Sequence, residues 1–189
     1  MVASPIFVTA EAFESLPEQV DPIELIGGEI FVSPTPTRKH QWIAGNLFAV
    51  LREIEKVKRT GKWTMSPTEV YISERDIFQP DIVLFSHKAM PDMKSRAARE
   101  IPLIVVEVLS PRTRSKDLVL KLPKYVARGV SECWIIDPFS HELSVFIPNA
   151  FGNLIETAVV HGLITVGLYA GTQLPFDEVF EDMTPNSWD

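Results

Sequence analysis

The sequence has little cysteine and no long hydrophobic run, and each absence excludes a class of protein. Cys133 is the only cysteine among the 189 residues, so no intramolecular disulfide can form. It lies in the strand-like run 132–136, where we expect a small buried side chain and not a reactive thiol. No apolar stretch reaches the roughly 18 residues that a transmembrane helix needs, so we expect no membrane span. Residues 1–12 lack the basic start and the long apolar stretch of a signal peptide, which makes the cytoplasm the expected compartment.

Several catalytic motifs are also missing. The chain has no Gly-x-Ser-x-Gly elbow, no Walker phosphate-binding loop, no dinucleotide-binding glycine cluster and no Cys or His pair at zinc spacing. The net charge of −7 argues against indiscriminate coating of nucleic acid. Residues 112–128 nevertheless contain six basic residues and one acidic residue, a local charge of +5. A local anion-binding surface and an ordinary solvated helix surface both account for this segment.

The apolar content is sufficient for a packed core. Hydrophobic residues make up 46% of the chain, and the length suits one domain, which we expect to span residues 1–189. The hydrophobic pattern indicates where helices and strands lie. We expect helices at 9–16, 38–58 and 115–128, a helix within 87–100, and strands at 23–26, 29–32, 63–72, 81–85, 103–109, 132–136, 142–147, 154–160 and 163–166.

The order of these elements predicts an α/β domain with a mixed sheet. Strand 103–109, helix 115–128 and strand 132–136 form a strand–helix–strand unit, which implies a parallel pair joined by a right-handed crossover. The Gly-Gly pair at 27–28 lies between two strand-like runs and predicts an N-terminal β-hairpin. Hairpins on both sides of the parallel pair imply antiparallel neighbours. We therefore expect a mixed sheet flanked by the long helix at 38–58 and by the crossover helix.

Two carboxylates stand beside apolar strand-like runs. Glu107 follows the run 101–106, and Asp81 precedes the run 82–85. An unpaired charge inside a strand costs several kcal/mol or shifts its pKa, so each carboxylate needs an opening to water or a cationic partner. Two carboxylates at the ends of two hydrophobic strands suit a divalent metal site. A turn-capping role for Asp81 and a structural role for Glu107 are the alternatives.

A longer pattern connects these residues to a known family. It comprises Pro80-Asp81, the stretch Glu-Val-Leu-Ser-Pro-Arg-Thr-Arg at 107–114, then Asp117, Lys121, Tyr125, Gly129-Val130, and Trp-Ile-Ile-Asp-Pro at 134–138. Upstream, Glu-Leu-Ile-Gly-Gly-Glu at 24–29 and His40 belong to the same pattern. Taken together, the pattern resembles the Uma-type family of restriction endonuclease-like bacterial proteins, a branch of the PD-(D/E)XK nuclease superfamily. The resemblance covers residues 20–148.

The resemblance implies a restriction endonuclease-like fold and a hydrolase that cuts phosphodiester bonds in DNA with Mg²⁺, or with Mn²⁺ as an alternative. It makes Asp81 and Glu107 catalytic metal ligands, assisted by the carbonyl of Val108. Nucleic acid is the implied partner, and no membrane partner is expected. A homodimer is expected because two strands must be cut and because the edge strands are short.

The lysine of this chain departs from the superfamily pattern. The superfamily lysine belongs two residues after the glutamate on the same strand, where this chain has Leu109. The family pattern points to Lys121 on the following helix as the candidate catalytic cation, since a long side chain can reach the same point in space. Pro123 removes one helix hydrogen bond, so we expect a kink or break beside Lys121. Lys121 and Asp117, four residues apart, also fit a simple surface ion pair.

Three further features allow two interpretations each. Residues 110–114 suit either a plain helix start or a phosphate-binding segment. His40 is either an exposed residue at a helix start or a group facing the metal cleft. The whole chain is either a Mg²⁺-dependent endonuclease or an inert nucleic-acid-binding or scaffold module that keeps the fold. Whether Lys121 reaches a cleft shared by Asp81 and Glu107 distinguishes these two functions.

Overall fold

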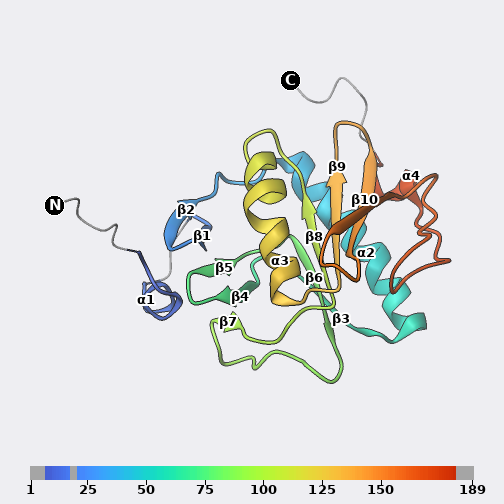
Figure 1. Ribbon diagram of the computed structural model, residues 1–189. Helices are drawn as coiled ribbons and strands as arrows, with labels where there is room; N and C mark the ends of the chain where they lie inside the picture. The colour runs from blue at the N-terminus through green and yellow to red at the C-terminus, as the bar shows by residue number, and fades with distance from the viewer. Residues whose placement is uncertain (1–6, 18–20, 182–189) are drawn as a thin grey trace.

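Two β-sheets form the centre of the protein (Figure 1). The computed structural model describes residues 7–17 and 21–181. The five-stranded sheet contains, in spatial order, β2 (Glu29–Val32), β1 (Ile23–Ile26), β5 (Asp76–Phe78), β4 (Glu69–Ser73) and β7 (Ala97–Ala98). The six-stranded sheet contains β11 (Leu154–Ala158), β10 (Glu142–Pro148), β9 (Glu132–Asp137), β8 (Ile104–Val108), β6 (Ile82–Ser86) and β3 (Gly61–Met65).

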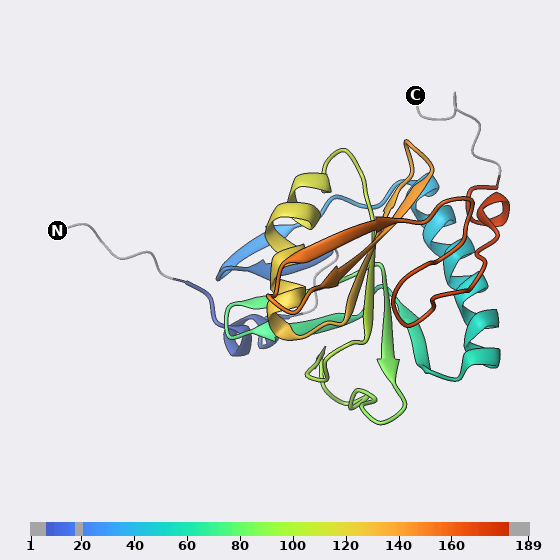
Figure 2. The ribbon, with the colours of Figure 1, turned by 45° about the vertical axis from the view of Figure 1, so that its right-hand side comes forward.

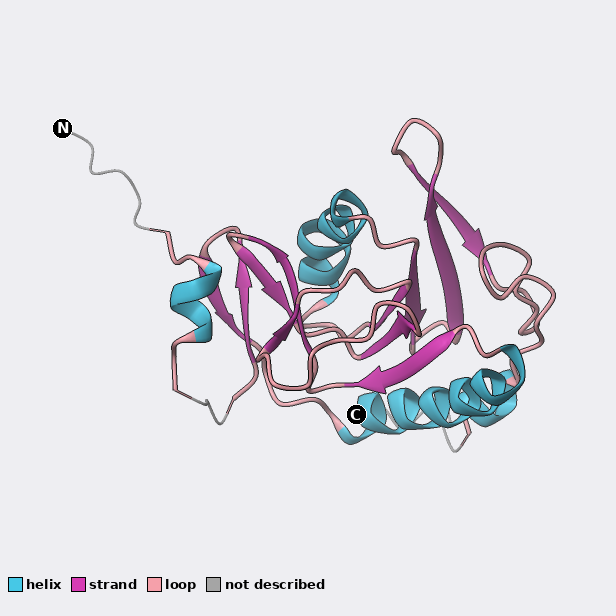
Figure 3. Cartoon of the chain, turned by 90° about the horizontal axis from the view of Figure 1, so that it is seen from below, coloured by secondary structure: helices cyan, strands magenta, loops and turns pink. Residues whose placement is uncertain are grey.

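Two helices cover opposite faces of the six-stranded sheet. Seen from below, α2 and α3 lie on either side of its strands (Figure 3). A short helix at the N-terminal end packs against the five-stranded sheet instead. The helical elements are α1 (Ala10–Glu14), α2 (Arg38–Lys58), the π-helix η1 (Lys116–Lys121), α3 (Leu122–Arg128) and α4 (Phe176–Val179).

Side-chain alternation along β8 places Glu107. Val106 packs in the core cluster that contains Leu47 of α2. Val105 packs in the second cluster, which contains Tyr125 of α3. Successive side chains of a strand point to opposite faces of the sheet. Glu107 therefore shares the α3 face with Val105 and is directed toward the crossover helices.

The predicted topology around this strand is confirmed. Strands β8 and β9 pair in parallel, and η1 and α3 lie between them in the chain. Strands β6 and β10 flank this pair in antiparallel fashion. The β1–β2 hairpin also forms, and both residues of its turn, Gly27 and Gly28, have positive φ angles of 64° and 86°. Only glycine adopts such angles freely, so this turn needs the Gly-Gly pair. Figure 2 shows the hairpin beside α3, on the opposite side of the molecule from α2.

Pro123 widens the crossover helix without breaking it. A proline ring has no N–H and clashes with the carbonyl four residues earlier. The preceding turns are wound as a π-helix, and the amide of Leu122 bonds to the carbonyl of Asp117, five residues back. The chain then continues as α3 until Gly129, whose φ of 101° ends the helix. The expected local disturbance is therefore confirmed as a π-helix, a form that is frequent at functional sites.

Helix α2 begins at Arg38 and ends at Lys58, as predicted. The hydroxyl of Thr37 accepts a hydrogen bond from the amide of His40 at 3.2 Å and caps the first turn. The helix ends at Lys58, and Arg59 adopts the left-handed conformation with φ of 51°. Gly61 is the first residue of β3.

Two corrections concern the sheets. Residues 63–72 were expected as one interrupted strand, but they belong to β3 and β4, which lie in different sheets. Pro67 separates them because proline cannot donate to a strand ladder. The chain thus builds two sheets where a single mixed sheet was expected, and β5 was not predicted at all.

Two further segments differ from expectation. Residues 87–100 form loops and β7 instead of a helix. Pro91 removes a helix donor, and the Asp92 side chain closes a turn by accepting from the amide of Lys94 at 3.0 Å. Residues 163–166 contribute only isolated bridges at Leu163, not a strand. Over residues 7–17 and 21–181, no helix is long and apolar enough to cross a membrane.

Substituting Gly61 by alanine should destabilise the protein. A Cβ at this position would lie 2.0 Å from the backbone carbonyl oxygen of Phe85, so β3 and β6 would have to separate. Gly45, in the middle of α2, is the matched control because a Cβ there meets nothing within 4 Å. Gly45→Ala should stabilise the protein by up to about 1 kcal/mol. Urea unfolding of the two variants measures the difference, and equal stabilities would contradict this account of β3.

Candidate active site

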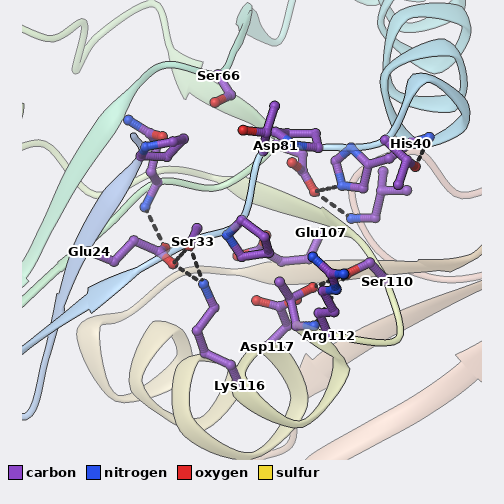
Figure 4. Close-up of a pocket in the computed structure, with 18 of the residues that line it drawn as sticks. Glu24, Ser33, His40, Ser66, Asp81, Glu107, Ser110, Arg112, Lys116 and Asp117 are labelled. Atoms are coloured by element: carbon purple, nitrogen blue, oxygen red, sulfur yellow. Dashed lines mark hydrogen bonds and ion pairs between the residues drawn. The ribbon is translucent and has the colours of Figure 1, made fainter. Parts of the chain in front are cut away.

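A pocket of about 340 Å³ opens where the two sheets meet the crossover helix. Its walls come from β1, the loop 33–37, the start of α2, the end of β8 and the segment 110–117. Asp81, Glu107 and Lys121, the three predicted catalytic residues, all line it. Figure 4 shows Asp81 above Glu107, with Glu24 to one side and Lys116 below.

Asp81 is held in place at the start of β6. Its Oδ2 accepts a hydrogen bond from the amide of Val108 at 2.7 Å, which joins β6 to the end of β8. The same oxygen lies 3.3 Å from Nε2 of His40 (Figure 4). Burial by itself would lower the pKa of His40, but its hydrogen bond and charge contact with Asp81 outweigh burial and raise it. With 20% of its side chain exposed, Asp81 remains open to the pocket.

Glu107 is almost completely buried, with 4% exposure. The hydroxyl of Tyr125 donates to its Oε1 at 2.7 Å, and Nζ of Lys121 lies 2.6 Å from the same oxygen. Burial raises the pKa of Glu107 to about 8, opposed by Lys121 and reinforced by neighbouring carboxylates. Glu107 thus lies inside β8 and not at an open strand end, and its charge is balanced by a cationic partner, Lys121.

Lys121 is the centre of a buried ionic cluster. It is 2% exposed, and its Nζ lies 2.6 Å from Glu107, 2.9 Å from Glu24 and 3.4 Å from Asp117. Burial alone would lower the pKa of Lys121, but these carboxylates raise it above its ordinary value and keep the ammonium charged. Asp117 itself is 4% exposed, and burial raises its pKa. The Asp117–Lys121 pair is thus buried and is not the surface pair that four-residue spacing allowed.

Glu24 joins the β1–β2 hairpin to this cluster. Its Oε1 accepts from the amide of Gln79 at 2.9 Å and pairs with Lys121. Its Oε2 pairs with Lys116 and accepts from the hydroxyl of Ser33 at 3.4 Å. Burial opposes ionisation, but the charges of Lys121 and Lys116 and the hydrogen bonds lower the pKa of Glu24 to about 2. A carboxylate that stays charged at neutral pH is therefore built into the pocket wall.

The basic segment after β8 divides into paired and open residues. Arg114 pairs with Asp137, and Lys116 donates to Ser33 at 2.7 Å as well as pairing with Glu24. Arg112 is exposed at the pocket rim and has no ion-pair partner among residues 7–17 and 21–181. Ser110 caps the turn by accepting from the amide of Thr113 at 3.2 Å. The segment therefore starts a helix, as one interpretation held, and also supplies cations to the pocket.

Sequence reasoning missed the roles of two residues in this site. Glu24 lies inside a short apolar strand, which is the same signal that singled out Glu107. Tyr125 was named as part of the family pattern with no role of its own in the site, but its hydroxyl donates to Glu107. His40, for which an exposed position at a helix start was one interpretation, lines the pocket beside Asp81.

The residues of the pocket suit a hard divalent cation that is completed by other ligands. Over the described parts of the chain, no three His, Cys, Asp or Glu side chains come close enough to hold a metal by themselves. Mg²⁺ does not require that, because it is usually bound by one or two carboxylates and keeps water or substrate phosphate in its other positions. Carboxylates also outnumber cations here: Glu24, Asp81, Glu107 and Asp117 line the pocket with Lys116, Lys121 and the rim residue Arg112. The donor set therefore fits Mg²⁺ or Mn²⁺ at Asp81 and Glu107.

The fold and the pocket together define an α/β protein of the restriction endonuclease-like type. The model of the family Uma2, described as "Putative restriction endonuclease", matches residues 10–175. The chain belongs to this family. Its membership and its α/β fold with mixed sheets confirm the resemblance that the sequence motifs indicated.

A solved structure shares the fold. The crystal structure of a "putative nuclease belonging to DUF820" from Anabaena variabilis superposes with a TM-score of 0.75 and is 22% identical in sequence. The match covers 92% of this chain and 97% of that chain. At this identity the likeness establishes the fold alone. None of the functionally curated proteins matches the chain.

Glu24 should make the stability of the protein depend on acid pH. Its folded pKa of about 2 lies below its ordinary 4.5, so its stabilising contribution is complete above pH 4.5 and is lost as pH falls toward 2. The shift corresponds to roughly 3 kcal/mol. Urea unfolding should therefore show a gap between the wild type and Glu24→Gln that narrows as pH falls below 4.5. Glu29→Gln, an exposed change on the same hairpin, should show no such gap. A gap that stays constant with pH would contradict the charge network drawn around Glu24.

Proposed function

We propose that the protein is a metal-dependent endonuclease that hydrolyses phosphodiester bonds in DNA. The observation that carries the proposal is the convergence of Asp81, Glu107 and Lys121 in one pocket. They come from three separate segments, yet Lys121 lies 2.6 Å from Glu107, and Asp81 bonds to the amide that follows Glu107. The family assignment supports a nuclease independently of this geometry.

Asp81 and Glu107 would hold Mg²⁺, or Mn²⁺ in its place. A bound divalent ion supplies charge to polarise the phosphate and to lower the pKa of a water molecule. Asp81 is suited to holding the ion because two neighbours, His40 and the amide of Val108, fix its carboxylate. Such supporting contacts orient metal ligands and raise their affinity. Glu107 brings the second carboxylate from the adjacent strand.

Lys121 would stabilise the negative charge that develops on the phosphate. The position of the superfamily lysine is taken by Leu109, which is buried. The π-helix directs Lys121 from the crossover to the same carboxylate that the strand lysine would accompany. A preorganised cation in a site shielded from water is worth more than one in solvent.

DNA is the substrate that best fits the charged surroundings of the pocket. Arg112 at the rim and Lys116 in the wall supply positive charge next to the carboxylates. Arginine and lysine side chains contact phosphates in most nucleic-acid complexes. Cutting both strands of a duplex calls for two active sites, so the proposal includes a homodimer. It also includes the cytoplasmic location that the sequence led us to expect.

Removing the two carboxylates should abolish metal binding and cleavage together. Isothermal titration of Mg²⁺ and Mn²⁺, with and without DNA, should show binding to the wild type and none to the Asp81→Asn/Glu107→Gln variant. Glu55→Gln is the control, because it changes a buried carboxylate that bonds to Trp63 outside the pocket. DNA cleavage by the double variant would contradict the proposed metal ligands. DNA binding by the wild type without any metal-dependent cleavage would instead favour the inert nucleic-acid-binding module.

Lys121→Ala should lower turnover with little change in metal affinity. Loss of one group that stabilises the transition state typically costs about 100-fold in kcat. Lys124→Ala is the matched control: Lys124 lies three residues later and pairs with the buried Asp76, but it does not line the pocket. Steady-state cleavage kinetics should separate the two variants. Full turnover in Lys121→Ala would move the catalytic cation to another residue.

A further inference from the structure

The side chain of Lys121 is long and flexible, so its charged end must be held in position by another group. It has four methylene groups and compact charge, so nothing in its own covalent structure fixes the ammonium group. A lysine on the same strand as Glu107 would have its direction set by the strand. Lys121 comes from η1, in a different element from either predicted metal ligand. Some other group must therefore determine where its charge lies.

Glu24 has the geometry to do this. Its Oε1 lies 2.9 Å from Nζ of Lys121 and also accepts the backbone amide of Gln79 at 2.9 Å. A hydrogen bond from the backbone fixes the position of the Glu24 carboxylate. Gln79 is two residues before Asp81, so this position is fixed relative to the candidate metal ligand. Glu24 is 2% exposed, and Ser33 and Lys116 engage its second oxygen (Figure 4). Both oxygens are thus immobilised before any substrate is present.

The second carboxylate that touches Lys121 cannot serve this purpose alone. A metal ion bound to Glu107 would attract the negative charge of its carboxylate, and the contact between Glu107 and Lys121 would then weaken. If Glu107 were the only strong partner, the ammonium group would also compete with the metal for that carboxylate. Glu24 contacts Lys116, Ser33 and the amide of Gln79 besides Lys121, so it can hold Lys121 while Glu107 binds the metal ion. Because Glu24 holds Lys121 at 2.9 Å, with Asp117 of the same helix at 3.4 Å, the ammonium group does not depend on Glu107 alone.

We propose that Glu24 is a positioning residue, which holds Lys121 beside the metal carboxylates and shares its ammonium group with Glu107. This inference rests on the proposed function and deepens it, since Glu24 would act through Lys121 and not on the substrate. It also assigns a purpose to the β1–β2 hairpin. The hairpin supplies the fixed end of the contact that aims a residue of the crossover helix.

The test compares Glu24→Gln with Asp76→Asn. Asp76 is a matched control because it also joins the hairpin to the crossover: it accepts from the amide of Gly27 at 2.7 Å and pairs with Lys124. Neither Asp76 nor Lys124 lines the pocket. Both variants loosen the same elements, but only Glu24→Gln removes a carboxylate from Lys121. An effect of Glu24 that is merely structural should therefore appear in both.

The first readout is the chemical reactivity of Lys121, which requires no activity. Reductive methylation of the full-length protein, followed by peptide mass spectrometry, should modify Lys121 several-fold faster in Glu24→Gln than in the wild type. Asp76→Asn should leave the rate at the wild-type value. Should Glu24→Gln fail to fold, Glu24→Asp carries the test, since it keeps the charge but retracts it by one methylene group. Equal Lys121 reactivity in the Glu24 and Asp76 variants would overturn the inference.

The second readout is cleavage. Glu24→Gln should lower kcat by about 10- to 100-fold with KM little changed, as is typical when a group supporting a catalytic site is lost. Asp76→Asn should leave kcat unchanged, and an equal loss in both variants would overturn the inference. If the wild type does not cleave DNA with either metal ion, the proposed function fails. The methylation rates would still show whether Glu24 aims Lys121.

Discussion

The burial of the Lys121 ammonium group among three carboxylates is the constraint on which the pocket depends. Neither charge type tolerates removal from water without a partner, and loss of one partner from such a cluster typically costs about 3–5 kcal/mol. Glu24 comes from the five-stranded sheet, Glu107 from the six-stranded sheet, and Lys121 and Asp117 from the crossover. The ionic cluster therefore connects the three parts of the fold. It also determines where they meet, and the pocket opens at that point.

The two sheets contribute different residues to this ionic cluster and to the pocket. The six-stranded sheet, with α2 and α3 on its faces, has large apolar clusters on both sides and provides a rigid frame. Asp81 and Glu107 stand on adjacent strands of that frame, and the amide of Val108 ties one to the other. The five-stranded sheet contributes fewer buried residues to the core but carries Glu24. One sheet thus holds the candidate metal ligands, and the other holds the partner of the cation.

The sequence was informative wherever one local pattern decides the structure. Alternating apolar runs identified most strands, the Gly-Gly pair identified the hairpin, and the order of elements identified the parallel pair. A lone carboxylate in an apolar run marked Glu107 correctly as a buried charge in need of a partner. Long-range choices were not visible in the same way. Nothing local indicates that 61–65 and 69–73 join different sheets, or that Glu24 and Lys121 meet, because those contacts join segments that are far apart in the chain.

The position of the lysine shows how a site can keep its chemistry while its source in the chain changes. Because Leu109 occupies the strand position, the cation must come from another element. In an ordinary α-helix each residue is rotated by a fixed angle from the one before it, and this winding sets the direction of its side chain. Pro123 disfavours that winding, and the wider turns of η1 alter the direction in which Lys121 projects. The side chain of Lys121 can reach Glu107 from the helix, but its direction is no longer fixed by a rigid strand. A buried carboxylate from a second sheet is a physical solution to that loss, which is why Glu24 belongs to the same arrangement as the displaced lysine.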